Sequence, residues 1–370
     1  MAHDLTNYVP ETLKMGMMGL REECIMPSLV NTDYGSEVAA KGDNIDVPIP
    51  SAVPASNVTP GTPISSDFSP TKRTISLSNW KEAGFTLSDK QLKEVENGVL
   101  PMQAYEAIKS IGNAVNESIL ALHTSLYSTW GTSGTTPDAV EDVTNPRKLL
   151  NGQLAPKRDR RIVWNSDAEA KMLELSLFTA ANQRGQATTL TEGQMGRVLG
   201  FDHYSDQAMD DISFDSNPPS LWDVNQADVA VGDTTVVLDG GTNDIKVGDV
   251  FTVAGDTQQY VATAALAAVA GTLSFFPAAK VAWANAAELT FFGDLAATSL
   301  AFHRDCFSLA VRPLETPSGL GVLAQTIVDP QSKLALRLEI SRPHKQTVWS
   351  YDILWGTLCT RPEFGVRIAG

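Results

Sequence analysis

The sequence predicts an α+β fold whose main parts are a long helix, an extended β-hairpin and a separate β-rich insertion. Three observations support this class. Apolar residues within 102–128 recur every three or four positions, alternating runs flank a Pro-rich stretch at 51–70, and short β-type runs fill residues 221–295. With 370 residues, the chain is too long for one simple core, so two or three units are expected.

Residues 5–31 mix short helical segments with Pro10 and Pro27. Leu13, Met17 and Leu20 can form a small apolar face. Unbranched methionines adapt to variable partners, and the candidate assembly residues of this segment are Met15, Met17 and Leu20. Two interpretations stay open, namely an arm that reaches a neighbouring molecule and a segment folded onto its own domain.

The next part of the chain predicts two strands joined by a long tip. Prolines bar the first strand from the middle of a sheet, and the tip at 51–70 is dense in Pro, Ser and Thr with hardly any charge. An isolated two-stranded ribbon is marginally stable, and a loop of this length is generally functional or disordered. We therefore expect a projecting hairpin that docks on a neighbouring copy. The candidate assembly residues of this hairpin are Ile45, Val47, Ile49, Ile75 and Leu77.

A short helix is predicted at residues 90–97, capped by Ser88 and Asp89, and the long helix follows. Pro101 suits the first turn of the long helix, and residues 129–136 end it. At 1.5 Å per residue it would be roughly 40 Å long. It is either the spine of an elongated subunit or a core helix of any α+β protein. Its apolar face contains Ile108, Ile111, Val115, Ile119, Leu122 and Leu126.

A basic run at residues 157–161 precedes a predicted strand at 162–164 and a helix at 168–181. Within the run, Arg158, Arg160 and Arg161 are candidates for contact with an anion or an acidic partner. The alternative is a solvated loop that forms ion pairs with the acidic remainder of the chain.

Gly193, Gly196 and Gly200 fall between short strands and predict a hairpin whose turns need positive φ or close backbone approach. They are not a phosphate loop, because no Gly-Lys-Ser/Thr follows them.

Residues 221–295 predict a small barrel or closed sandwich inserted into another domain, because short strands alternate there with Gly/Asp turns. Strand-like runs resume at residues 300–315, 334–340, 345–353 and 365–368. The predicted strands of the insertion are 234–239, 249–254, 259–263, 272–276 and 288–292.

No residue pattern indicates an enzyme, a cofactor or a metal site. In a strand, His303 and Asp305 share one face and Cys306 takes the other, so these three do not converge. The glycines at 319–324 match a dinucleotide fingerprint, but a proline precedes them and no helix follows. An acidic cluster offers carboxylates to a divalent cation, yet it fits no calcium loop, and a solvated acidic loop is the favoured alternative. Its members are Asp202, His203, Asp206, Asp210, Asp211 and Asp215.

The composition limits the partners and the cellular compartment that the protein can have. A net charge of −15 argues against a nucleic-acid-binding surface over the whole chain, although a local basic patch remains compatible with it. Three cysteines without close spacing fit neither a disulfide framework nor a zinc site and suit a reducing cytosol. We expect no membrane span, since residues 260–279 are mostly alanine, and the first residues lack the regions of a secretory signal.

Taken in order, these parts resemble the major capsid proteins of tailed bacteriophages with the Hong Kong 97-type fold. The β-rich insertion is similar to the inserted domain of the Salmonella podovirus coat proteins. Three motifs carry the resemblance: the hairpin Glu192-Gly193-x-x-Gly196-x-x-Leu199-Gly200-Phe201, the strand Ala301-Phe302-His303-x-Asp305, and the ending from Asp352-Ile-Leu-Trp-Gly356 to Pro362-Glu363-x-Gly365-Val366-x-Ile368.

The resemblance implies a domain order. It gives an N-terminal arm at 1–35, an extended hairpin loop at 36–85, a peripheral domain with the spine helix at 86–160, an axial domain at 161–220, the inserted domain at 221–295, an axial return at 296–320 and peripheral strands at 321–370.

The resemblance also implies a structural role without catalysis. Copies of the chain would form pentamers and hexamers of an icosahedral shell around double-stranded DNA, without sequence-specific binding. Scaffolding protein, portal and a decoration protein are the implied partners, and the virion, assembled in the bacterial cytoplasm, is the implied location. Two alternatives stay open, an encapsulin-like compartment that holds a cargo enzyme and a soluble hydrolase using the acidic cluster.

Overall fold

The computed structural model divides the chain into two compact units. The first contains Met1–Val115 and Ser308–Thr360, and the second contains Asn116–Phe307 and Arg361–Gly370. Each unit is described by itself. The structure describes residues 25–34, 44–49, 55, 57–58, 70–90, 99–132, 134–179, 192–209, 219–226, 228–293, 298–314, 323–328 and 333–369.

The predicted long helix is present as α5 (Val99–Leu120), and the boundary between the units falls within it. It ends earlier than the predicted Ser128, because η1 (Ala121–Ser125) continues it as a 3-10 helix. Side chains compete with the backbone there: the Thr124 hydroxyl donates to the Ala121 carbonyl, and the His123 ring bonds the Leu120 carbonyl. Ile108, Ile111, Val115, Ile119 and Leu126 are buried as expected, whereas Leu122 is half-buried.

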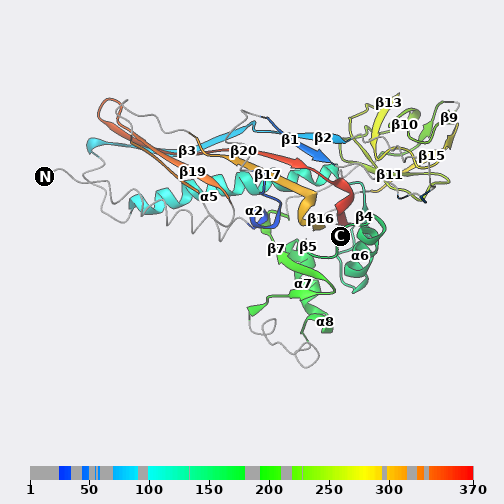
Figure 1. The fold of residues 1–370 in the computed structure, drawn as a ribbon, viewed down its shortest axis with the longest axis horizontal. Helices are drawn as coiled ribbons and strands as arrows, with labels where there is room; N and C mark the ends of the chain where they lie inside the picture. Colours follow the sequence, from blue (N-terminus) through cyan, green and yellow to red (C-terminus); the bar gives the residue numbers. More distant parts are fainter. Residues whose placement is uncertain are drawn as a thin grey trace. The chain divides into compact units, whose positions relative to one another are not determined.

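The first unit is built on a five-stranded sheet that α5 accompanies in Figure 1. The predicted C-terminal strands are confirmed. The strand predicted at 345–353 is longer than expected, since β20 extends to Cys359. We did not predict β3, although Ala83, Phe85 and Leu87 alternate with Gly84, Thr86 and Ser88 in its second half. The strands are β17 (Phe307–Arg312), β20 (Gln346–Cys359), β19 (Ala335–Ser341) and β18 (Leu323–Val328) in that order, with β3 (Asn79–Ser88) paired to β20.

The predicted hairpin is also confirmed in its strands. β1 (Asn44–Ile49) and β2 (Thr71–Ser76) pair antiparallel from Asn44↔Ser76 to Ile49↔Thr71. Just before β1 in the chain, the short helix α2 (Met26–Leu29) is buried, and Asn31 bridges to Ser308. The chain between residues 25 and 34 is therefore docked on its own unit.

The second unit contains a six-stranded sheet and an inserted barrel (Figure 1). The neighbouring strands β21 and β16 are buried along their whole length, which places the core of the unit around them. The sheet order is β4 (Thr129–Trp130), β21 (Gly365–Ala369), β16 (Thr298–His303), β5 (Arg160–Trp164), β7 (Phe201–Ser205) and β6 (Gly196–Val198).

The helices of this unit differ from the prediction in two ways. The helix predicted at 168–181 is divided into α7 (Ser166–Glu174) and α8 (Ser176–Thr179), with Leu175 extended between them. Asn165 caps α7, because its side chain accepts from the Ala168 amide at 2.9 Å. A third helix, α6 (Glu141–Gly152), was not predicted.

The strand predicted through residues 303–306 is wrong, since η3 (Arg304–Cys306) interrupts it. The Asp305 amide donates to Nδ1 of His303 at 3.2 Å, which turns the chain between β16 and β17. Burial lowers the pKa of His303. Cys306 is buried, and the hydrogen bond from the Asp305 amide makes His303 the cap of this turn.

The β-rich insertion is a closed barrel, as predicted, in the order β10-β13-β12-β11-β15-β8. Its core is filled by aromatic side chains, including Trp222, Phe251, Tyr260 and Phe275. Gly241 is required where Trp222 crosses β10, because a Cβ there would lie 1.9 Å from the indole ring. The barrel strands are β8 (Trp222–Val224), β10 (Thr235–Gly241), β11 (Val250–Val253), β12 (Tyr260–Ala262), β13 (Val269–Phe276) and β15 (Glu288–Phe291), with a separate pair β9 (Asp228–Val229) and β14 (Trp283–Ala284).

The barrel is fastened to the segment that follows α5. Tyr127 packs with Val250 and Val261, and Gln259 exchanges two hydrogen bonds with the backbone of Thr129 at 2.7 and 2.9 Å. The fully buried Arg367 donates to the Gly248 carbonyl at 2.8 Å and to the Leu126 carbonyl. These contacts join the barrel, β21 and the end of the helix within one unit.

The same region predicts a pH dependence of stability. Burial, and then the nearby charge of Arg367, lower the pKa of His123 from 6.5 to about 4. Because the folded state disfavours the protonated ring, the unfolded chain binds more protons between these values. The free energy of unfolding should therefore fall as pH drops from about 6.5 to about 4, by up to about 3 kcal/mol.

Urea unfolding followed across this pH range checks the effect. His123→Asn retains a donor for the Leu120 carbonyl and has no titrating ring, so its curve should be flatter than that of the wild type. Parallel curves for the two proteins would contradict this role of His123.

Candidate functional site

The base of the β1–β2 hairpin is anchored in its own unit. Ile45, Val47, Ile75 and Leu77 are each at most 6% exposed and pack with Ala310, while Tyr34, Leu354 and Leu358 cover the cluster. The backbone approaches closely as well, since a Cβ on Gly356 of β20 would lie 2.3 Å from the Ser76 carbonyl oxygen.

This burial changes how the predicted contact residues are understood. We expected the apolar face of the hairpin to be available to a neighbouring copy, but these four side chains already have partners within the chain. Arg73 adds to the anchor by donating to the Cys359 carbonyl at 2.9 Å. Ile49, at the far end of β1, is half-buried, and its role in assembly stays a prediction.

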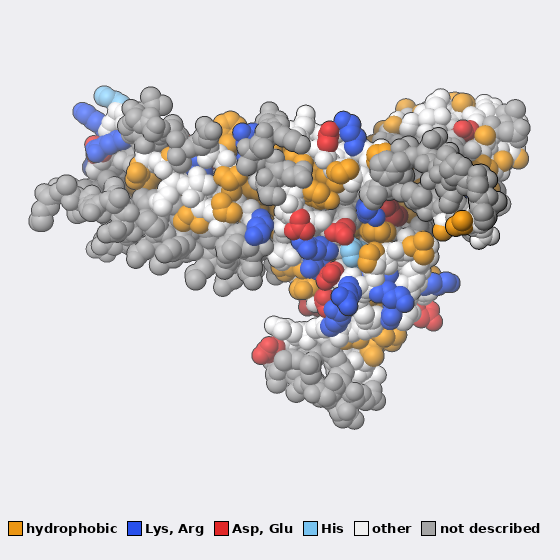
Figure 2. Space-filling model, in the orientation of Figure 1, with side chains coloured by type: hydrophobic (Ala, Val, Ile, Leu, Met, Phe, Trp, Pro, Cys, Tyr) orange, Lys and Arg blue, Asp and Glu red, His pale blue; other side chains and the backbone are white. Residues whose placement is uncertain are grey.

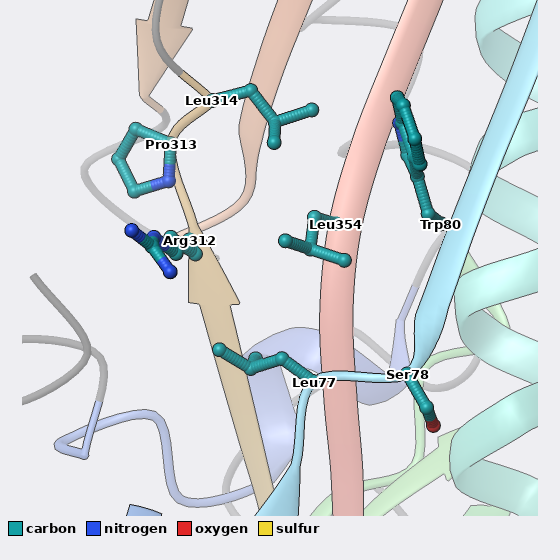
Figure 3. Close-up of a pocket in the computed structure, with 7 residues that line it drawn as sticks. All are labelled: Leu77, Ser78, Trp80, Arg312, Pro313, Leu314 and Leu354. Carbon is teal, nitrogen blue, oxygen red and sulfur yellow. The ribbon is translucent and has the colours of Figure 1, made fainter. Parts of the chain in front are cut away.

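Beside the anchored hairpin lies an open pocket of about 500 Å³ (Figure 3). Leu354 of β20 lies between Trp80 on one side and Arg312 and Pro313 on the other, and the pocket begins at Leu77, directly after β2. Trp80 is 65% exposed, an unusual state for the largest apolar side chain. The residues that line the pocket are Leu77, Ser78, Trp80, Arg312, Pro313, Leu314 and Leu354.

Trp80 is held in place from beneath the surface. Its indole Nε1 donates to Oδ2 of Asp352 at 3.0 Å. Asp352 also accepts two hydrogen bonds from the Arg337 guanidinium, at 2.9 and 2.6 Å. The side chains of Arg337 and Asp352 are only 13% and 6% exposed, and the hydrogen bonds to Asp352 raise the pKa of Arg337. An exposed aromatic ring is thus fixed by a buried, bidentate ion pair.

Sequence reasoning missed this group of residues. Trp80 stands within the polar run Ser78-Asn79-Trp80-Lys81-Glu82, which is the one signal that could have singled it out. The pairing of Asp352 with Arg337 and Trp80 could not be read from the sequence, because it depends on the register of β20 with both β19 and β3.

The basic run does not form one continuous charged surface. Arg158 is exposed and Arg161 is half-buried, but Arg160 is 2% exposed. Arg160 donates to the carbonyls of Ala155 and Pro156, each at 2.7 Å, and burial lowers its pKa. Arg160 is therefore a structural residue and not an exposed contact, because its guanidinium replaces missing backbone partners in the preceding turn.

Around the run, basic and acidic side chains are mixed on the visible face (Figure 2). Burial lowers the pKa of Arg161, while Tyr204 and the acidic Asp159 and Asp202 oppose that change. This mixture fits the predicted alternative of a loop that pairs with acidic neighbours better than it fits a phosphate-binding surface. A role of Arg158 and Arg161 in assembly stays a prediction.

The glycine hairpin forms as predicted. β6 and β7 pair antiparallel through Val198↔Phe201, and Leu199 and Gly200 turn the chain with φ of 50° and 87°. Gly193 and Gly196 also have positive φ. Arg147 donates to the Leu199 carbonyl at 2.9 Å, which ties the turn to α6. Whether this hairpin meets other copies stays a prediction.

The acidic cluster is structural where the structure describes it. Asp206 is buried and accepts from Asn116 at 2.7 Å, while the His203 ring accepts from the Trp164 indole at 3.0 Å. Asp202 faces Arg197 at 3.7 Å. Within the described residues, no three His, Cys, Asp or Glu side chains are grouped to hold a metal ion, and no helix has the length and apolarity to cross a membrane.

Several predictions fall on residues outside the described ranges. In the first 97 residues they are the candidate assembly residues of the arm (Met15, Met17, Leu20), the tip at 51–70 apart from residues 55, 57, 58 and 70, and the helix at 91–97. Further along the chain they are the acids Asp210, Asp211 and Asp215 and the glycines at 319–321.

A hairpin anchored on a sheet beside a long helix, together with a second sheet and an inserted barrel, is a fold that this chain shares with solved phage structures. A solved structure of Mycobacterium phage Che8 shares it with a TM-score of 0.54 and 12% identity, over 94% of this chain and 91% of that one. The capsid of cyanophage P-SCSP1u is similar with a TM-score of 0.52 and 10% identity, over 94% of this chain and 88% of that one.

No family model and no curated protein matches the sequence. A virus-like particle from Pyrococcus furiosus gives a TM-score of 0.42 at 8% identity, over 95% of both chains, which is too distant to carry an argument. At 10–12% identity, the two phage structures establish a common fold.

Proposed function

We propose that this chain is the major capsid protein of a tailed double-stranded DNA bacteriophage, with the Hong Kong 97-type fold. Copies of it assemble into pentamers and hexamers of an icosahedral shell that encloses the genome, so the protein resides in the virion and catalyses no reaction. Assembly with a scaffolding protein and a portal, and binding of a decoration protein, belong to the same proposal.

One observation carries the proposal. The similarity to a phage capsid extends over 94% of this chain and 88% of the other, so it is not confined to one unit or to the insertion. A shared single domain would leave many functions open. A match over nearly the full length of both chains supports a shared architecture, and that architecture is specialised for building shells.

The site supports the same role. An anchored hairpin and a rigid, exposed Trp80 are features of a protein–protein contact, since aromatic residues are enriched at such interfaces. Each contact in a closed shell can be weak, because many contacts act together. The inserted barrel favours the branch of the Salmonella podovirus coat proteins, which we include in the proposal.

Electron microscopy of the purified protein, combined with sedimentation over a range of concentrations, tests the proposal. We expect closed particles of uniform size built from five- and six-fold capsomers. A compact monomer at every concentration would contradict it. Particles from infected cells that contain an enzyme and no DNA would favour the encapsulin-like alternative instead.

A further inference from the structure

His203 is a buried histidine of the second unit, and both nitrogens of its ring are engaged. It lies on β7, is 7% exposed, and packs against Trp164 of β5 and Phe178 of α8, with ring centroids 6.1 and 5.2 Å away. The Trp164 indole Nε1 donates to Nδ1 of His203 at 3.0 Å. On the other side of the ring, Nε2 lies 3.2 Å from the Val198 carbonyl oxygen of β6.

The chemistry of these two partners fixes the protonation state of the ring. An indole N–H can only donate and a backbone carbonyl can only accept, so Nδ1 carries no hydrogen and Nε2 carries one. His203 is therefore a neutral imidazole in the folded chain. A proton added at Nδ1 would face the indole hydrogen of Trp164, and the buried ring would become charged. Both changes are unfavourable away from water.

The carboxylates around this ring are already bound to other groups. On the face of the sheet that carries His203, Glu169 of α7 accepts from the Ser205 hydroxyl at 2.6 Å, and β5 adds the positive Arg160. Just beyond β7, Asp206 accepts from the Asn116 amide at 2.7 Å, and α8 contains no charged residue. The opposite face carries the remaining charged and titratable side chains of β5, β6 and β7, which are Arg161, Arg197, Asp202 and Tyr204.

The strands that His203 holds together are at one end of the sheet. The order β16-β5-β7-β6 places β6 at the edge, and it pairs with β7 only from Gly196↔His203 to Val198↔Phe201. The fully buried strands β16 and β21 lie on the other side of β5. A short strand pair at an edge opens at a lower free-energy cost than the core of a domain. The β6–β7 hairpin can therefore leave β5 while the core strands stay folded.

We propose that the ring of His203 is a pH-sensitive switch that holds the β6–β7 hairpin on β5 at neutral pH and releases it in mild acid. An imidazole ordinarily takes up a proton near pH 6.5. The closed hairpin excludes that proton, whereas in the open hairpin both ring nitrogens donate to water. On protonation, the hydrogen bonds to Trp164 and Val198 are lost together. The inference concerns the second unit by itself and stands whether or not the chain builds a shell.

Proton linkage sets the direction and size of the effect. Because only the open form binds the proton, the closed form is fully stable above about pH 6.5 and loses stability as the pH falls. The equilibrium constant for opening should rise by up to about tenfold for each pH unit below that value. Between about pH 7 and pH 5 we expect a roughly 25-fold increase.

Amide hydrogen exchange of the full-length protein at these two pH values tests the switch. Protection factors correct for the intrinsic effect of pH on exchange, and those of the β6 and β7 amides should fall roughly 25-fold in the wild type. His203→Gln keeps an acceptor for the indole and a donor for the Val198 carbonyl, but it has no titrating ring. Its β6 and β7 amides should change by less than about twofold.

The matched control is His123→Asn, which removes another buried imidazole of the same unit. Its β6 and β7 amides should lose protection as those of the wild type do. Equal losses in the wild type and in His203→Gln would overturn the proposal. A response that His123→Asn abolishes and His203→Gln retains would overturn it as well.

Nitrogen-15 NMR of the histidine rings in the unaltered protein gives an independent measurement, which serves even if His203→Gln does not fold. Near neutral pH, His203 should show an unprotonated Nδ1 and a protonated Nε2. On acidification, the doubly protonated ring should appear only together with the loss of amide protection in β6 and β7. A hydrogen on Nδ1 at neutral pH, or a charged ring in a hairpin that stays protected, would overturn the proposal.

Discussion

Asp352→Ala is expected to lower the free energy of unfolding of the first unit by about 3–5 kcal/mol. Asp352 is the common partner of Trp80 and Arg337, and removing it leaves the Arg337 guanidinium largely buried with Glu339, at 3.7 Å, as its remaining acidic neighbour. Chemical denaturation of the variant measures the loss directly.

A double variant shows whether the loss comes from an uncompensated charge. Asp352→Leu combined with Arg337→Met removes both charges and fills the space with apolar atoms, so it should recover most of the lost stability. A loss below about 1 kcal/mol for Asp352→Ala would mean that the ion pair is solvated in solution.

Ile75→Ala is expected to cost about 2–5 kcal/mol and to weaken assembly. Ile75 is fully buried between the hairpin and β20, where its loss would leave a cavity in the small cluster that anchors the hairpin. Because this cluster anchors the hairpin, we expect proteolysis to cut the β1–β2 segment of the variant faster than that of the wild type.

Lys72→Ala is the matched control on the same strand. Its side chain is 71% exposed and pairs with Asp46 on the solvent side, an interaction of small expected value. Stability and cleavage rate should stay close to the wild type for this variant. If Ile75→Ala left the cleavage rate unchanged while lowering stability, the hairpin would be anchored mainly by other contacts, such as Arg73 with the Cys359 carbonyl.

The long helix, the two hairpins and the barrel could be predicted because each has a local signature. The periodicity of Ile108, Ile111 and Val115 predicts a helix, and the Gly/Asp turns of the insertion predict its short strands. The glycine at position 200 predicts a turn of positive φ, and its φ of 87° agrees. These features depend on residues close together in the chain.

Other features depend on residues far apart in the chain, and the sequence alone left them undecided. The alternation of Ile45 with Val47 identified a strand with one apolar face, but it did not say which molecule covers that face. The tertiary structure places Ala310 and Leu354 against it. In the same way, Arg160 looked like an exposed charge, whereas backbone carbonyls in the preceding turn enclose it.

The sequence by itself determined the long helix with its apolar face, the two hairpins and the presence of a compact insertion. Only the tertiary structure decided which faces are already covered and which, like the ring of Trp80, remain open to a partner. The physical reason is that periodicity and turn chemistry report the conformation of neighbouring residues. Burial and ion pairing are fixed by strand register, which brings together residues as distant as Trp80 and Asp352.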